Sequence, residues 1–193
     1  MAASGVDPEV MRGSVAQVPG VEIVALHTSP RHAYEGRPAE GPRPDPEGGA
    51  RDHVVIRAGH GAVGDRYAGR PAHREAAVTV IAVEALEHVA AVLGLPAVPD
   101  PLLTRRTIVL RGADVDGLAR TRDRPGAVFT LDSGDGPVRL RAHRPASPCA
   151  WMETVLGTGA FRALWGRGGV RCEPLTDGVL RVGPARLETG TGR

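Results

Sequence analysis

The sequence predicts a mainly β protein, a closed or nearly closed β-barrel with one main helix and short helical segments. About seven or eight short runs of apolar or alternating residues have strand patterns. Turn residues such as Gly, Pro and Asp separate these runs, and only the segment at about 83–94 has a long helical pattern. Strands joined by hairpins and loops, rather than by regular helices, are typical of a barrel.

Composition indicates one globular domain. The 193 residues can bury a sizeable core, and 41% of them are hydrophobic. Aromatic residues make up only 3%, so Val, Leu, Ile and Ala must fill that core. We expect a single barrel domain over 21–188, between an N-terminal tail at 1–20 and a C-terminal tail at 189–193.

Charge and cysteine content narrow the function. The formal net charge of +2 is too small to indicate a nucleic-acid partner, and no basic run supports one. No apolar stretch is long enough for a membrane span, and residues 1–20 lack the apolar region of a signal peptide. We therefore expect a cytoplasmic protein with reduced thiols and no membrane partner. All 24 basic residues are arginine, so the chain has no lysine to hold pyridoxal phosphate (PLP) as a Schiff base.

The first third of the chain predicts two strands joined by a long loop. Residues 21–26 and 52–58 have strand patterns. Between them, residues 29–50 are dense in Pro and Gly, which can support neither a helix nor a regular strand. This segment is expected to be a long surface loop.

Residues 59–64, Gly-His-Gly-Ala-Val-Gly, match the G-x-G-x-x-G pattern of dinucleotide-binding sites, and Glu84 follows 20 positions after Gly64. A pyrophosphate-binding helix should begin there, but a Gly and a Pro interrupt residues 65–71. We therefore reject a dinucleotide site and expect the glycines to form a tight surface corner. Asp65, directly after this corner, is expected to stabilise it by accepting backbone N–H bonds.

The middle of the chain predicts the main helix and further strands. Residues 76–83 are almost entirely apolar, which is typical of a strand buried on both faces. A helix is expected at 83–94, because its apolar residues fall on one side. Further strands are expected at 105–111 and, as a hairpin across a turn rich in Gly and Asp, at 127–131 and 138–143.

Cys149 is the centre of the predicted site. It follows Pro148 and a strand end that carries His143 and Arg144, and residues 150–156 can form a short helix after it. The first N–H groups of a helix and nearby cations both favour a thiolate, the form that attacks sulfur or binds metal. The alternative is that Cys149 is a small buried apolar residue, as free cysteines often are.

The C-terminal part predicts a short helical patch at 161–164 and a second hairpin. Its strands are expected at 170–175 and 179–187, with Asp177-Gly178 as the turn. Cys172 lies within the first of these alternating strands, with neither a proline before it nor a helix after it. We therefore expect Cys172 to serve packing alone.

Six short motifs occur in order along the chain. They are 61–69 (Gly-Ala-Val-Gly-Asp-Arg-Tyr-Ala-Gly), 78–81 (Val-Thr-Val-Ile) followed by Glu84, 105–112 (Arg-Arg-Thr-Ile-Val-Leu-Arg-Gly), 148–152 (Pro-Cys-Ala-Trp-Met), 166–170 (Gly-Arg-Gly-Gly-Val) and 177–178 (Asp-Gly). Together they resemble the MOSC family, named for the C-terminal domain of molybdenum cofactor sulfurases, over about 21–188. One departure is Thr107, where many relatives carry Asn, so a ligand that this Asn orients would be held differently here.

The resemblance implies a MOSC barrel, similar to the pyruvate-kinase barrel, and a functional cysteine at Cys149. In relatives this cysteine is proposed to carry sulfur as a persulfide, and in cofactor-binding members it is a ligand to molybdenum. Three functions stay open. Cys149 carries or transfers sulfur received from a donor protein, such as a cysteine desulfurase with its own PLP. Alternatively, the chain binds a molybdenum cofactor through Cys149 and reduces or detoxifies N-hydroxylated compounds, or it is a binding barrel without chemistry.

Arginines near the predicted site are candidates to bind an anionic group or a cofactor phosphate. The candidates are Arg66, Arg105, Arg106, Arg141 and Arg144. Paired arginines can instead simply bridge carboxylates. His143 is a candidate proton relay, with a solvent-exposed strand residue as the alternative. Gly64 and Asp65 are expected to have a structural or indirect role. No His pair has the spacing of a zinc site, so no metal site is predicted apart from Cys149 in a molybdenum-binding protein.

Overall fold

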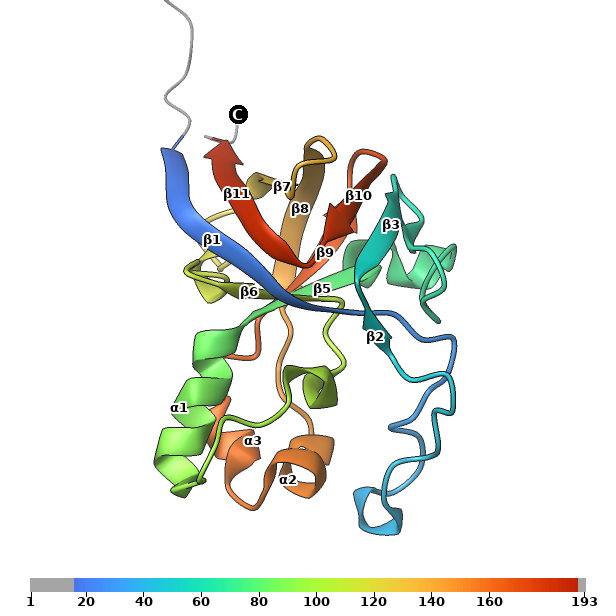
Figure 1. Ribbon diagram of the computed structural model, residues 1–193, viewed down its shortest axis with the longest axis vertical. Coiled ribbons are helices and arrows are strands. Elements are labelled where there is room, and N and C mark those ends of the chain that lie inside the picture. Colours follow the sequence, from blue (N-terminus) through green and yellow to red (C-terminus); the bar gives the residue numbers. More distant parts are fainter. Residues whose placement is uncertain (1–15, 191–193) are drawn as a thin grey trace, which may run out of the picture.

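The computed structural model describes residues 16–190, and its centre is a closed barrel of seven strands (Figure 1). The strand order around the barrel is β11-β7-β8-β9-β5-β6-β1, and β1 pairs with β11 to close it. The bounds are β1 (Ala16–His27), β5 (Val78–Ala82), β6 (Ile108–Arg111), β7 (Val128–Asp132), β8 (Val138–Pro145), β9 (Val170–Pro174) and β11 (Gly183–Gly190). The short β2 (Ala50–Arg51) pairs with the end of β1. The predicted mainly β barrel is confirmed.

Three α-helices lie together at one end of the barrel, opposite the start of β1 and the end of β11 (Figure 1). They are α1 (Val83–Leu93), α2 (Trp151–Leu156) and α3 (Ala160–Ala163). α1 begins directly after β5 and ends at Gly94, which takes a left-handed φ of 64° that a glycine adopts without strain. Leu86 and Val89 of α1 are fully buried and share a core with Trp151. The two short helices thus help to cover the apolar face that the sequence predicted for the main helix.

Within residues 16–190, four 3₁₀ segments complete the helical part: η1 (Pro38–Glu40), η2 (Pro71–Ala76), η3 (Pro101–Thr104) and η4 (Asp116–Leu118). The chain forms a turn, then η2, after the glycine-rich corner, so the helix that a dinucleotide site requires is not formed there. Within residues 16–190, no helix has the length and apolar character needed to cross a bilayer.

A second core fills the barrel. Its members are aliphatic side chains together with Cys172 and one aromatic, Phe129, and the alternating residues Val138, Leu140 and Ala142 of β8 all belong to it. The alternation of buried and exposed residues along β8 matches the period-two pattern of its sequence. The hairpin of β7 and β8 forms as predicted, with Phe129 opposite Leu140.

The second predicted hairpin is wrong. β10 (Gly178–Arg181) pairs with β3 (His53–Arg57), which also pairs with β4 (Gly61–Ala62) to form a separate three-stranded sheet. The Asp177 carboxylate accepts bonds from the Ala58 N–H and the Arg57 guanidinium, at 2.8 and 2.9 Å. The Asp-Gly signal therefore fixes the start of β10 against the end of β3, instead of turning β9 back on itself.

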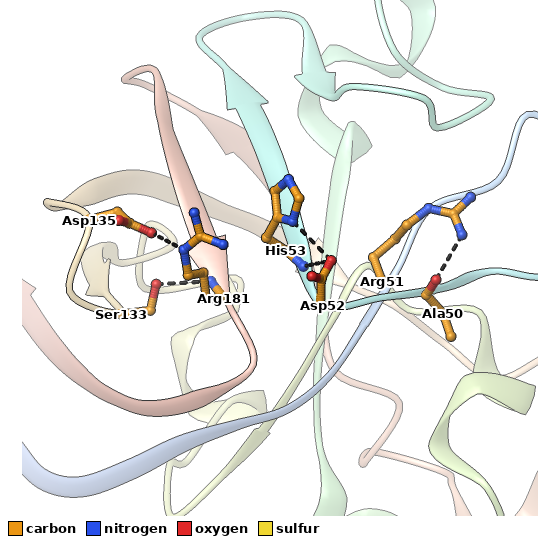
Figure 2. A network of polar contacts seen from close by, with 7 residues as sticks. All are labelled: Ala50, Arg51, Asp52, His53, Ser133, Asp135 and Arg181. Carbon is orange, nitrogen blue, oxygen red and sulfur yellow. Dashed lines mark hydrogen bonds and ion pairs between the residues drawn. The ribbon is translucent and has the colours of Figure 1, made fainter.

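Polar contacts join this small sheet to the turn between β7 and β8 (Figure 2). The Arg181 N–H donates to Ser133 Oγ at 2.9 Å, and the Arg181 guanidinium pairs with Asp135. On the neighbouring strand, the His53 N–H donates to the Asp52 carboxylate at 2.9 Å. These contacts lie on the surface, so they position β10 more than they stabilise it.

Three predicted boundaries differ from the structure. β1 begins at Ala16 and β11 ends at Gly190, because these two strands pair along most of their length. Parts of both expected tails are therefore strand, and residues 1–15 and 191–193 lie outside the described range. β6 begins at Ile108 rather than at Arg105, because Arg105 ends η3 with a left-handed φ of 52°.

Gly169 gives a test of the barrel packing. It has a φ of 84°, and a Cβ added there would lie 2.0 Å from the backbone oxygen of Val80. Gly134, in the β7–β8 turn, has a φ of 107° with nothing within 4 Å of an added Cβ. We expect Gly134→Ala to lower the free energy of unfolding by about 1–2 kcal/mol through backbone strain alone. Gly169→Ala should lower the free energy of unfolding by at least about twice as much, because the clash with β5 adds to the backbone strain. Chemical denaturation measures both, and equal losses would contradict the packing described.

Candidate functional site

A cavity of about 220 Å³ lies where the end of β1, the loop at 29–50, the corner after β4, the η3–β6 junction and the start of α2 meet. Five of the residues predicted for the site line this cavity: Asp65, Arg66, Arg105, Arg106 and Cys149. The other four, Gly64, Arg141, His143 and Arg144, do not line it. The strand order explains this gathering, because β5 lies between β6 and β9 and brings their ends together.

Cys149 is exposed and has a free thiol. Its carbonyl accepts a bond from the Met152 N–H at 2.9 Å, so it forms the turn that leads into α2. Cys172 is also free but lies fully buried in β9, and burial raises the pKa of its thiol far above the usual range. The two thiols thus differ as predicted in burial, and Cys149 is the accessible one.

Arg106 is held in the cavity wall by backbone oxygens. Its Nε donates to the Gly168 oxygen at 3.1 Å and its Nη2 to the Ala146 oxygen at 2.8 Å. Burial, and then the positive charge of Arg171, lower the pKa of Arg106 to about 10, so it stays charged at neutral pH. Among the residues that the structure describes, no carboxylate lies within ion-pair distance of Arg106.

Arg66 and Arg171 add two further positive charges. Arg66 donates to the Tyr67 hydroxyl at 2.7 Å and its guanidinium lies 4.4 Å from the centre of that ring, while its Nη1 is buried without a partner. Burial, and then Arg144, lower the pKa of Arg171. Neither arginine forms an ion pair within residues 16–190. Arg171 was not predicted from the sequence, because only the pairing of β9 with β5 brings it to the cavity.

Arg105 has a different environment. It forms an ion pair with Asp45 at 3.1 Å, donates to the Arg31 oxygen at 2.9 Å and lies over the Tyr34 ring. Ser29 Oγ donates to the same Asp45 carboxylate at 2.7 Å. The charge of Arg105 is therefore neutralised by the loop at 29–50, and its role is to hold that loop in place.

The loop at 29–50 forms one wall of the cavity. Tyr34 stacks on Trp151 of α2, with ring centres 5.2 Å apart, and its hydroxyl donates to the Leu103 oxygen. Burial raises the pKa of Tyr34 to about 12, so the phenol stays protonated at neutral pH. His32 also lines the cavity. This proline-rich segment is thus an ordered part of the site.

Gly64 and Asp65 form the corner that the sequence predicted. Gly64 has a φ of 84°, and the Asp65 carboxylate accepts a bond from the Tyr67 N–H at 2.9 Å. Burial raises the pKa of Asp65. The carboxylate therefore shapes the turn that places Arg66, and it is the only carboxylate among the residues that line the cavity.

His143 lies outside the cavity between two glutamates. Its Nδ1 is 3.6 Å from Glu75 and its Nε2 is 3.4 Å from Glu173. Arg141 and Arg144 are exposed on the same strand, β8. Arg141 is exposed because it alternates with the inward residues Leu140 and Ala142, and Arg144 because the register of β8 shifts between Ala142 and Pro145. The structure thus separates these three residues from Cys149, although they are close to it in sequence.

Thr107, which departs from the motif of the resembled family, has a structural partner. The Thr79 N–H donates to Thr107 Oγ1 at 3.1 Å, and the Thr107 N–H donates to Thr79 Oγ1 at 3.0 Å. This reciprocal pair joins the start of β5 to the residue before β6 in the cavity wall.

His27, at the end of β1, is a second residue that the sequence analysis missed. It is only 4% exposed and lines the cavity, and its Nδ1 has no hydrogen-bond partner. The opposite edge of the ring packs against Gly49, where an added Cβ would lie 2.0 Å from Nε2. Burial, and then Arg105, lower the pKa of His27 to about 4. At neutral pH it is an uncharged imidazole facing a cationic cavity.

No protein-family model matches this chain, and no curated protein matches it by sequence. Solved structures with a similar fold include the YUAD protein from Bacillus subtilis, at 14% identity and a TM-score of 0.67, over 93% of this chain and 100% of that one. YiiM from Geobacillus stearothermophilus (13%, 0.57) covers 87% and 75% of the two chains. YiiM from Escherichia coli (15%, 0.56) covers 91% and 72%. At such low identity the likeness shows the fold alone, which agrees with the β-barrel expected.

The buried His27 predicts a specific loss of stability in acid. Its pKa of about 4 lies below the ordinary 6.5, so the unfolded chain takes up the proton first as the pH falls. The stability contributed by the neutral ring is complete above about pH 6.5 and is lost progressively toward pH 4. When the pH is lowered from about 7.5 to about 5, the free energy of unfolding should fall by about 2 kcal/mol more in the wild-type protein than in the His27→Gln variant. Denaturant titrations at both pH values measure this difference, and parallel losses in the two proteins would refute the assignment.

Proposed function

We propose that this protein carries sulfur as a persulfide on Cys149 and is a single-domain relative of the MOSC family. The observation that supports this most is that the exposed Cys149 thiol shares a cavity with three guanidinium groups, those of Arg66, Arg106 and Arg171. None of the three forms an ion pair with a carboxylate among the described residues. Cations favour the thiolate over the thiol and the ionised persulfide over its protonated form. A thiolate is the form that accepts sulfur.

The proposed roles follow from how each side chain is held. Arg106 is fixed by two backbone carbonyls, so its remaining N–H groups are available to a negative sulfur or its donor. Arg66 offers the buried, unpartnered Nη1. Asp65 and Arg105 act indirectly, by shaping the corner and holding the loop at 29–50.

A protein donor is consistent with the exposure of Cys149. Sulfur passes between persulfides by attack of a thiolate on the outer sulfur, which requires both sulfur atoms to be accessible. A cysteine desulfurase, with its own PLP, is the proposed partner in the cytoplasm. This chain has no lysine and cannot hold PLP as a Schiff base.

A second candidate is a protein that binds a molybdenum cofactor. The residues fit the charge of such a group, since Arg66 and Arg106 can donate to a phosphate and Cys149 supplies a thiolate ligand, but the cavity of about 220 Å³ is smaller than sites for ligands of that size. When bound, this cofactor would supply the electrons for reduction of N-hydroxylated compounds. The chain's own contribution would be to hold the phosphate and to shield one side of the site with Tyr34 and Trp151.

Because the Cys149 thiol is the accessible one, we expect transferred sulfur to be found on Cys149. After incubation with a cysteine desulfurase and cysteine, the mass of one added sulfur atom should appear on the peptide that contains Cys149. Alkylation of the native protein at neutral pH should likewise label Cys149 at least about tenfold faster than the buried Cys172. Peptide mass spectrometry measures both signals. Cys149→Ser should abolish them, while Cys172→Ser, the matched control, should retain them.

The same preparation separates the candidate functions. Labile sulfur without molybdenum supports the sulfur carrier, whereas molybdenum in a one-to-one ratio, lost in Cys149→Ser, supports the cofactor protein. A protein with neither, whose Cys149 accepts no sulfur from the desulfurase, would be a binding barrel without chemistry, and the proposal would be wrong.

A further inference from the structure

The cavity beside Cys149 holds more positive charge than the described residues neutralise. Arg66, Arg106 and Arg171 line it without an ion pair, and Asp65 already accepts a backbone N–H bond. Partly buried guanidinium groups without a counter-charge lower the free energy of unfolding, because they lose hydration without a compensating interaction. The lowered pKa of Arg106 and of Arg171, caused first by burial, reflects this cost. An anionic ligand would offset it.

Unused hydrogen-bond donors point to the same kind of ligand. Arg66 Nη1 is buried without a partner. His27, nine-tenths buried and uncharged, presents a ring edge with an unpartnered Nδ1 among the lining residues. A neutral imidazole can donate one hydrogen bond, and a guanidinium group only donates. A ligand with several negative oxygen atoms would satisfy these donors together.

The size of the cavity limits the ligand. Sites for drug-sized molecules have volumes of about 300–1,000 Å³. The cavity here, at about 220 Å³, is smaller than that range and suits an anion of few atoms. Cys149 lines the same cavity, so the thiol and the cationic groups can contact one small ligand at once.

We infer that the cavity binds a small sulfane-sulfur donor of the thiosulfate class, and that Cys149 takes sulfur directly from it. This inference rests on the proposed function, because it requires a persulfide on Cys149. The oxygen atoms of the donor face the arginines and His27, and its outer sulfur faces the thiolate. A direct small-molecule donor would load the protein without a partner protein.

The sulfur transfer balances without an added reductant or oxidant. The Cys149 thiolate attacks the outer sulfur of thiosulfate and forms a new S–S bond. The S–S bond of thiosulfate breaks, and sulfite leaves with the electron pair. The products are one ionised persulfide and one sulfite dianion, so both charge and atoms are conserved. Arg106 and Arg171 stabilise the negative charge on the leaving sulfite.

The test is the loading of the full chain by inorganic thiosulfate. Sulfite release and the added sulfur mass on Cys149 should appear together, in equal amounts. Arg171→Gln should lower the second-order rate constant of loading at least about tenfold, because it removes a charge-assisted hydrogen bond. This variant is expected to fold, since Arg171 has no side-chain partner among the described hydrogen bonds and ion pairs. The matched control is Arg139→Gln, which removes an exposed arginine of β8 that does not line the cavity and should leave the rate unchanged.

Binding alone gives a second measurement. In Cys149→Ser, which cannot react, thiosulfate and sulfite should still raise the melting temperature, and Arg171→Gln in that background should remove the shift. If a cysteine desulfurase loads Cys149 but thiosulfate neither binds nor loads it, the inference is wrong and the proposed function stands. If neither donor loads Cys149, both are wrong. Equal loading rates in Arg171→Gln and Arg139→Gln would overturn the assignment of the cavity as the donor site.

Discussion

The pairing of β1 with β11 is the contact on which the rest of the structure depends. These strands lie at opposite ends of the chain, and their antiparallel register runs from Ala16 opposite Thr189 to Ile23 opposite Gly183. Closing the barrel removes the two sheet edges that would otherwise remain unpaired. It also fixes β1 between β11 and β6, so that the end of β1, which pairs with β2, brings His27 to the cavity wall.

The closed strand order gathers the positively charged side chains of the site. The strand order places the start of β6, the end of β1 and the segment before α2 around one small cavity, although Arg66, Arg106 and Cys149 are about forty residues apart in sequence. Backbone oxygens hold Arg106, while the loop at 29–50 neutralises Arg105. Neighbouring arginines thus have different roles: one holds a loop and the other keeps its charge available beside the thiol.

Local patterns in the sequence predicted much of the fold. Alternation identified β8, a 3.6-residue period identified α1, and the proline before Cys149 marked the turn into α2. The partner of β10 was not predictable in this way, because an Asp-Gly pair signals a turn without specifying which strand follows it. Cations near Cys149 were expected, but some of them were expected from β8, the wrong strand. Arg141 and Arg144 are near in sequence yet do not line the cavity, whereas Arg171 and His27 reach it only through long-range strand pairing.

The most direct test of the account compares an anionic with a neutral alkylating reagent at Cys149. Iodoacetate and iodoacetamide share the same reaction, so the ratio of their rate constants reports the charge around the thiolate. In an arginine-lined cavity at low salt, the ratio of the iodoacetate to the iodoacetamide rate constant should be several-fold higher for Cys149 than for a free small thiol. The preference should shrink as ionic strength rises. A ratio equal to or below that of the free thiol, independent of salt, would contradict a cationic site around Cys149.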